Sequence, residues 1–127
     1  MNPTNTLYEK LGGAAAVDLA VEKFYEKVLA DERVQHFFAH TDMARQKQHQ
    51  KAFMTYAFGG ANHWNGRPMR DAHSNLVAEM GLTDHHFDAI AEDLVATLVD
   101  LEVPQALIDE VVEIVGSSAH RNDVLNR

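Results

Sequence analysis

Cysteine is absent from the 127 residues of this chain, which excludes disulfides, thiolate metal sites and cysteine nucleophiles. Its absence fits the reducing cytosol, and we expect a cytoplasmic protein. Basic residues are also few, since 11 Lys and Arg face 19 Asp and Glu and the formal charge is -8. Such a surface repels nucleic acid and anionic membranes, so neither is expected as a partner.

Long apolar runs are missing as well. No run approaches the roughly 20 residues that span a bilayer, and the first residues have neither a basic region nor an apolar core, so no membrane segment or export signal is expected. The length suits one hydrophobic core, and we expect a single domain over 1–127 that acts as a monomer. No convincing β-alternation occurs, so the predicted fold class is all-α.

Apolar residues recur at helical spacing along most of the chain. A capping box at Thr6 opens a short helix that stops at Gly12, and a clear stripe follows on a helix from Ala14 to Leu29: Val17, Ala20, Val21, Phe24 and Val28. Further helices are predicted over 42–58, 68–80, 84–101 and 104–115, with a helical turn at 34–40 and a polar tail after Gly116. The helix over 104–115 is expected to turn these residues inward: Leu107, Ile108, Val111, Val112 and Val115.

The segment from Asp42 to Phe58 carries polar groups on its predicted buried face. Helical spacing places these residues on one side: Gln46, His49, Gln50, Phe53 and Ala57. A buried amide or imidazole without a partner costs about 1–3 kcal/mol, so something must satisfy these groups. A polar seam inside the protein and a bound ligand are equally good explanations at this point.

His73 is a second imidazole on a predicted inward face, which it shares with Leu76, Val77 and Met80. Considered alone, a satisfied core histidine is the simpler interpretation. Together with His49 on another helix, however, it forms the pair that axial ligation of haem iron needs. Neutral imidazole also suits iron as a ligand.

Two other polar groups have simpler interpretations. His36 and His40, four residues apart, could clamp a divalent ion, but the further ligands that such sites need at fixed spacing are missing. Tyr25 lies at the edge of its helix stripe, where we expect the ring to pack and the hydroxyl to reach water. No nucleophile–base pair, phosphate loop or paired-carboxylate site is recognisable.

Several stretches together carry a family resemblance that runs almost end to end: Leu7 to Gly13, Phe24-Tyr25, Phe37-Phe38, Gln46 to Phe53, Thr55 to Gly60, Met69 to His73, and His120 to Asn126. In these stretches the chain resembles the group I truncated haemoglobins, in particular the cyanobacterial type. The resemblance implies a truncated globin fold, a two-over-two helical sandwich around haem b, with His73 as the proximal iron ligand. It also implies that three side chains line the distal side: Tyr25, Gln46 and Gln50. His49 would take the sixth iron position when no external ligand is bound, and His120 matches a histidine that joins covalently to a haem vinyl group.

The resemblance makes reversible binding of oxygen and other diatomic ligands the expected function, with a role in handling nitric oxide and reactive nitrogen. His49 must leave before a ligand binds, so motion of the 42–58 helix would gate binding. Arg45 and Arg70 are candidates to pair with the haem propionates, with surface solvation as the equal alternative. The following side chains would pack the porphyrin faces, although all would also serve an ordinary core: Phe37, Phe38, Phe53, Leu76, Phe87 and Ile90.

Other functions stay open at this level. A nitric oxide dioxygenase would use the same scaffold together with an unidentified reductase. A bis-histidine haem also suits electron transfer or a peroxidase-like activity, because it changes oxidation state with little ligand rearrangement. A helical interaction module without haem would instead bury the polar seam against a partner protein.

Overall fold

The computed structural model describes residues 6–61 and 69–126. Within these ranges it is helical, which confirms the predicted class, and the elements are α1 (Leu7–Leu11), α2 (Gly13–Ala30), the 3-10 helix η2 (Gln35–Phe38), α3 (Met43–Ala57), α4 (Met69–Met80), α5 (Asp84–Asp100), α6 (Gln105–Val115) and α7 (Ser118–Leu125). Residue 68, where the fourth predicted helix was to begin, lies outside the described residues. None of the described helices is both long and apolar enough to cross a membrane.

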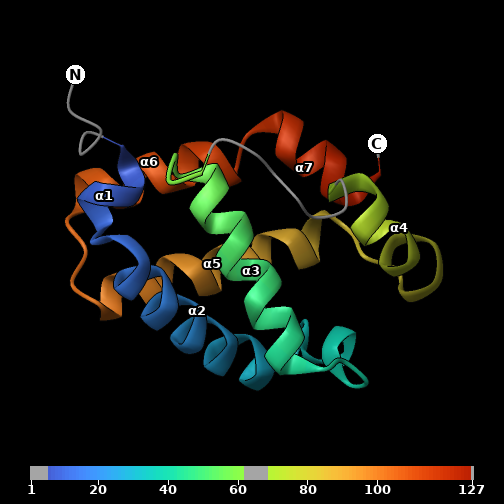
Figure 1. Cartoon of the computed structure of the whole chain (residues 1–127). Helices are drawn as coiled ribbons and strands as arrows, with labels where there is room; N and C mark the ends of the chain where they lie inside the picture. Colours follow the sequence, from blue (N-terminus) through green and yellow to red (C-terminus); the bar gives the residue numbers. More distant parts are fainter. Residues whose placement is uncertain (1–5, 62–68, 127) are drawn as a thin grey trace.

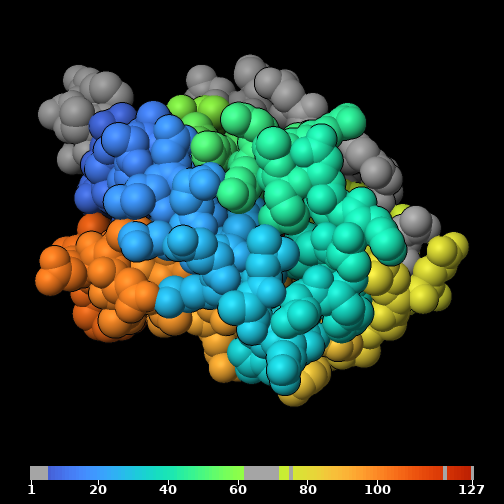
Figure 2. All heavy atoms as spheres, turned by 90° about the horizontal axis from the view of Figure 1, so that it is seen from below, coloured from blue at the N-terminus to red at the C-terminus, as the bar shows by residue number. Residues whose placement is uncertain are grey.

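Four of these helices form two layers. The helices α2 and α3 contact each other, as do α5 and α6, and α2 also lies against α5 (Figure 1). The face formed by α2 and α3 is continuous in the space-filling view, where blue-to-cyan α2 borders green α3 (Figure 2). The helix α4 lies apart from these layers and contacts α7. The predicted two-over-two arrangement is therefore confirmed.

The predicted stripe on α2 forms the centre of the core. All five of its residues are buried, and Val21 and Val28 have no exposed surface. They meet apolar side chains from the other three helices of the two layers: Met54 and Phe58 near the end of α3, Leu94 and Leu98 on α5, and Ile108 and Val111 on α6. Removal of this apolar surface from water is the main force that holds the layers together.

The prediction for the residues after Gly116 is wrong. The residues after Gly116 were expected to form a polar tail, but they form α7, because the Ser117 side chain caps its first turn by accepting from the His120 N–H at 3.2 Å. The apolar contacts of this helix are with residues distant in sequence, since Val124 and Leu125 pack with Phe87. A pattern within the segment itself could not reveal those contacts.

Two apolar residues that were expected to face inward are exposed. Val112 on α6 is 43% exposed, because Ile108 and Val111 already occupy the side of α6 that faces the core. Met80 is 42% exposed, because it is the last residue of α4 and the chain turns away at Gly81, where φ is +71°.

A histidine takes part in capping α5. Thr83 precedes the helix, and its backbone N–H donates to His86 Nδ1 at 3.1 Å, so an imidazole acts where a capping box has glutamate or glutamine. Burial lowers the pKa of His86, and the nearby imidazoles of His36 and His85 lower it further. Protonation of His86 would remove the acceptor and place positive charge at a helix N-terminus.

This cap predicts a loss of stability in acid. Because the folded-state pKa of His86 lies below its unfolded value, the unfolded chain binds the proton first as pH falls below about 6.5, and the free energy of unfolding decreases. His86→Gln keeps an acceptor that does not titrate in this range. Urea unfolding at pH 7.5 and pH 5 should therefore show a smaller decrease for His86→Gln than for the unmodified chain. Equal decreases in the two proteins would show that this cap is not the acid-sensitive element.

Candidate functional site

The most buried polar contact in the candidate site joins α2 to α3. Tyr25 on α2 is 2% exposed, and Gln46 on α3 donates from Nε2 to its hydroxyl at 3.0 Å. The rings of Phe24 and Phe38 contact the tyrosine ring edge-on, with centroids 5.0 and 5.8 Å away. The prediction that this hydroxyl reaches water is wrong, because α3 and the two aromatic rings cover it.

Burial determines the protonation state of this phenol. It raises the pKa of Tyr25 to about 12, while the hydrogen bond from Gln46 lowers it by a smaller amount. The phenol is therefore protonated at neutral pH. Because its oxygen accepts from Gln46, its own O–H remains able to donate to a third group. Gln50, one turn after Gln46, is half-buried and adds a second amide to the same helix.

One flank of α3 is fixed against α2. Met54 is 2% exposed and belongs to the main core. On the same flank, Lys47 pairs with Glu22 at 3.1 Å and Lys51 pairs with Asp18 at 3.6 Å, both carboxylates being on α2. These ion pairs are partly exposed and each contributes at most about 1 kcal/mol, so they set the register of α3 more than they stabilise it.

His49 and Phe53 share the other flank, since they are four residues apart on α3. Phe53 is half-buried, but His49 is exposed, so the prediction that His49 lies in the interior is wrong. The physical reason is the direction in which α3 packs, because Met54 is the residue of α3 that the core buries, and His49 lies more than about 90° round the helix from it. Gln46 does contact α2, through its hydrogen bond to Tyr25, and both Gln46 and Gln50 are half-buried.

An aromatic cluster gathers around His120. The Phe53 ring stacks on the imidazole with centroids 5.4 Å apart and an interplanar angle of 22°. Phe87, the fourth residue of α5, lies 5.9 Å from the imidazole at 59°. The guanidinium of Arg121 covers the Phe87 ring at 4.4 Å. Sequence analysis assigned these residues separately, and the structure brings them together from α3, α5 and α7.

His73 belongs to the same neighbourhood. It is half-buried on α4, the helix that contacts α7. Burial lowers the pKa of His120, the charge of His73 lowers it further, and Asp123 raises it. His73 is thus close enough to disfavour protonation of His120. Neutral imidazole is the form that binds metal.

The remaining predicted residues are distributed around this site. Phe38, Leu76 and Ile90 are partly buried and pack against the main core. Arg45 is exposed, and its backbone N–H donates to the capping carboxylate of Asp42 at 3.3 Å. Arg70 falls on α4, but its side chain lies outside the described residues.

The alternative metal clamp gains no support. The His36 ring lies against Phe37 and His86, with centroids 4.2 and 5.9 Å away. In the two described ranges, no group of three or more His, Asp or Glu side chains is arranged to hold a metal ion. His40 has no part in either contact.

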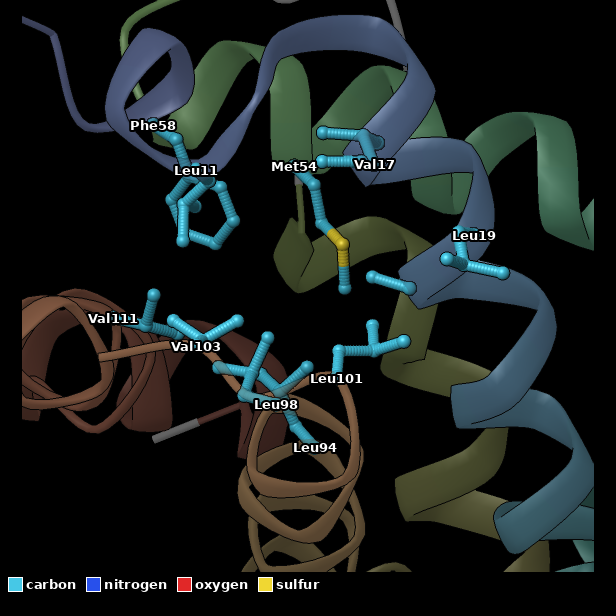
Figure 3. A pocket seen from close by; sticks show the side chains of 12 residues that line it. Leu11, Val17, Leu19, Met54, Phe58, Leu94, Leu98, Leu101, Val103 and Val111 are labelled. Atoms are coloured by element: carbon cyan, nitrogen blue, oxygen red, sulfur yellow. The ribbon is translucent and has the colours of Figure 1, made fainter. Parts of the chain in front are cut away.

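Sequence analysis missed an apolar pocket at the other end of α3. It has a volume of about 150 Å³ and is lined by twelve residues, among them Leu11, Val17, Met54, Phe58, Leu98 and Val111. Figure 3 shows the Met54 side chain reaching down between the α2 and α5 side chains that line it. The short side chains of Ala16 and Ala20 on α2 were the only sequence signal for this space.

Three comparisons with known proteins bear on this site. The family model described as bacterial-like globin matches residues 6–123. Over 123 residues the chain is 61% identical to the group 1 truncated hemoglobin GlbN of Synechocystis sp., with 97% of this chain and 99% of that protein covered. It is also 47% identical over its full length to a group 1 truncated hemoglobin of Tetrahymena pyriformis, which is covered completely.

Solved structures agree with these relationships. The 2/2 hemoglobin of Synechococcus sp. PCC 7002, in the cyanomet state and with covalently attached heme, matches with a TM-score of 0.94 and 74% identity over 96% of this chain and 99% of that one. The Fe(III) form of truncated hemoglobin from Tetrahymena pyriformis matches with a TM-score of 0.82 and 47% identity over 92% and 97%. The chain therefore belongs to the bacterial-like globin family and, within it, to the group 1 truncated haemoglobins.

Proposed function

We propose that this chain binds haem b and uses it to bind oxygen and other diatomic ligands reversibly. The observation that carries the proposal is the buried hydrogen bond between Tyr25 and Gln46, since it provides a protonated phenol within an apolar interior. A small polar ligand can accept a hydrogen bond there without competition from bulk water. Membership of the truncated haemoglobins supports haem as the group to which that ligand binds.

The residues present fit haem. His73 offers an imidazole donor on α4 and would be the proximal iron ligand. Phe53, Phe87 and Leu76 offer the apolar surface that a porphyrin needs, and exposed Arg45 is available to a propionate. His120 is half-buried beside His73 and would form the covalent bond to haem, as supported by the covalently attached heme of the Synechococcus relative.

The side chains around the ligand have different roles in binding it. Haem iron supplies the reversible binding of diatomic gases. Tyr25 donates its O–H to the ligand, and Gln46 holds that phenol in place through the 3.0 Å hydrogen bond. Gln50 contributes a second N–H from the next turn of α3. Together they slow the escape of a ligand that accepts hydrogen bonds.

His49 would act against ligand binding as a displaceable sixth ligand. It shares a flank of α3 with Phe53, and across 6–61 and 69–126 no hydrogen bond or ion pair holds its imidazole. Its side chain is therefore able to turn toward or away from the iron at low cost. The apparent affinity for an external ligand falls by the fraction of molecules in which His49 is displaced.

Oxidation of nitric oxide to nitrate is the second candidate function. The pocket of about 150 Å³ beside Met54 and Phe58 supports it, because an apolar space of this size suits a second diatomic molecule. In the reaction, nitric oxide combines with both atoms of the bound oxygen, and each nitrate formed leaves the iron oxidised by one electron. Turnover therefore needs an electron donor, for which we propose a separate reductase in the cytosol.

One experiment tests both functions. The chain is loaded with haemin, reduced and exposed to oxygen, and its visible spectrum should change reversibly as oxygen is added and removed. Addition of nitric oxide should then give about one nitrate per haem, and several when a chemical reductant is supplied. Failure of the reversible change would overturn the binding proposal. Loss of oxygen without nitrate would overturn the second candidate and leave the first.

The same preparation reports on the covalent bond and on the monomeric state that we expect. After reduction with haem bound, extraction into acid and ketone should leave haem on the unmodified chain and remove it from His120→Ala. Light scattering of the loaded protein should give the mass of one chain. Complete extraction from both proteins would contradict the role of His120.

A further inference from the structure

A groove outside the candidate site runs between α5 and α6. Its volume is about 470 Å³, and its ten lining residues include Ala91 and Val95 on α5, Val112 and Val115 on α6, and Gly116 directly after α6. The floor of the groove is apolar, and its small side chains leave room for larger apolar side chains of another molecule. The haem proposal makes no use of this groove.

The groove leaves apolar surface exposed to water. Val112 on α6, which was expected to face inward, is 43% exposed. Val99, one turn beyond Val95 on the same stripe of α5, is 56% exposed. Single exposed valines are ordinary, but here they continue one apolar surface along two neighbouring helices.

Carboxylates flank this surface on both helices. Asp88 and Glu92 line the groove on α5 and are more than half exposed. On α6, exposed Asp109 lies three residues before Val112 and therefore on the same face of the helix. The groove is therefore an apolar strip with negative charge along both edges.

The neighbouring cations do not neutralise these edges. Arg121 is shared between Asp88 at 2.8 Å and Asp84 at 2.9 Å. Arg33 makes its two shorter hydrogen bonds to Asp31 and reaches Glu92 only at 3.3 Å. Carboxylates thus outnumber cations at the groove, in a chain whose formal charge is -8.

We infer that this groove binds a segment of another protein that presents a ridge of apolar side chains flanked by Lys or Arg. Charge complementarity selects this occupant, since cations beside the ridge would meet the carboxylate edges. A second copy of this chain fits poorly, because it would bring the same carboxylates against each other. The inference does not depend on haem binding or on any activity.

An occupant of the groove would also reach the edge of the candidate site. Asp88 holds Arg121, whose guanidinium covers the Phe87 ring 5.9 Å from the His120 imidazole. A Lys or Arg from the partner would compete with Arg121 for this carboxylate. The docked partner would therefore lie within a few side chains of the residues proposed to hold haem.

The test uses the haem-loaded full chain, labelled with nitrogen-15, and synthetic amphipathic helices as probes. The first peptide carries Leu along one face with Lys on both sides, the second has Glu for Lys, and the third has Ser for Leu. The Lys peptide should shift the backbone amide signals of α5 and α6 around Val95 and Val112. Its dissociation constant should be at least about tenfold lower than those of the other two peptides, and should rise with salt.

Matched variants separate this site from general attraction to an acidic protein. Asp109→Lys on α6 should weaken binding of the Lys peptide, whereas Glu26→Lys, an exposed change of equal charge on α2, should leave it unchanged. Equal weakening by both variants, equal binding of the Lys and Glu peptides, or signal changes away from the groove would overturn the inference. A dimer in light scattering that Val112→Lys abolishes would also overturn it, in favour of self-association.

Discussion

Replacement of His49 by alanine should convert the haem-loaded protein from a low-spin to a high-spin visible spectrum in both oxidation states. The unmodified chain would hold iron between two imidazoles, and the variant would leave one axial position to water or to an external ligand. If His49 occupies that position in about nine of ten molecules, its removal should raise the observed rate of ligand binding about tenfold. Stopped-flow mixing with carbon monoxide measures this rate.

Two other histidines serve as controls for this result. His40→Ala changes an exposed residue before α3 and should leave the spectrum and the rate unaltered. His73→Gly should remove the proximal donor and loosen haem, and added imidazole should restore the spectrum. If His49→Ala keeps the low-spin spectrum of the unmodified chain, His49 is not the sixth ligand, whatever the behaviour of His73.

Replacement of Tyr25 by phenylalanine should raise the rate of oxygen dissociation by about 10- to 100-fold. A hydrogen bond to a polar or charged partner in a buried site contributes about 1.5–3 kcal/mol, and each 1.4 kcal/mol corresponds to a factor of ten. The variant keeps the ring that contacts Phe24 and Phe38, so the packing of α2 is preserved. Rapid mixing of the oxygenated protein with excess carbon monoxide gives the dissociation rate.

The matched control is Tyr56→Phe. Tyr56 lies on α3 and is 42% exposed, so loss of its hydroxyl should leave oxygen dissociation within about twofold of the unmodified rate. An oxygen dissociation rate for Tyr25→Phe that matches the control would show that the phenol does not hold the ligand. In that case Gln46, no longer paired with Tyr25, would be the residue to test next.

Local patterns in the sequence predicted the helices that carry a regular stripe of apolar residues of their own. The α2 stripe and the cap at Thr6 agree with the structure, since the hydrogen bond of a cap joins residues three apart. The helix α7 was missed because its apolar residues are few and find their partners on α5. The exposure of Val112 depends on which sides of α6 are covered by other helices. The periodicity of the α6 sequence does not contain this information.

The candidate site was predictable in its residue types but not in its contacts. Tyr25 and Gln46 were named separately, and their hydrogen bond depends on how α2 crosses α3. His49 was assigned to a buried face because Gln46 and Gln50 share its spacing, yet the residue of α3 that the core buries is Met54. The stacking of Phe53 on His120 joins two helices distant in sequence, and only the folded chain brings them together.

The ion pairs from Lys47 and Lys51 to α2 hold the same flank of α3 as Met54 and the Gln46 amide. These contacts hold α3 against α2 along one flank. On the opposite flank the exposed side chain of His49 can rotate about its own bonds. The sixth-ligand switch proposed for His49 would then work by rotation about the bonds of its own side chain, with the α3 backbone stationary, and not by the motion of the 42–58 helix that the sequence led us to expect. Its intrinsic speed is then that of rotamer exchange, on the order of picoseconds to nanoseconds, and not the microseconds that a sliding helix would take.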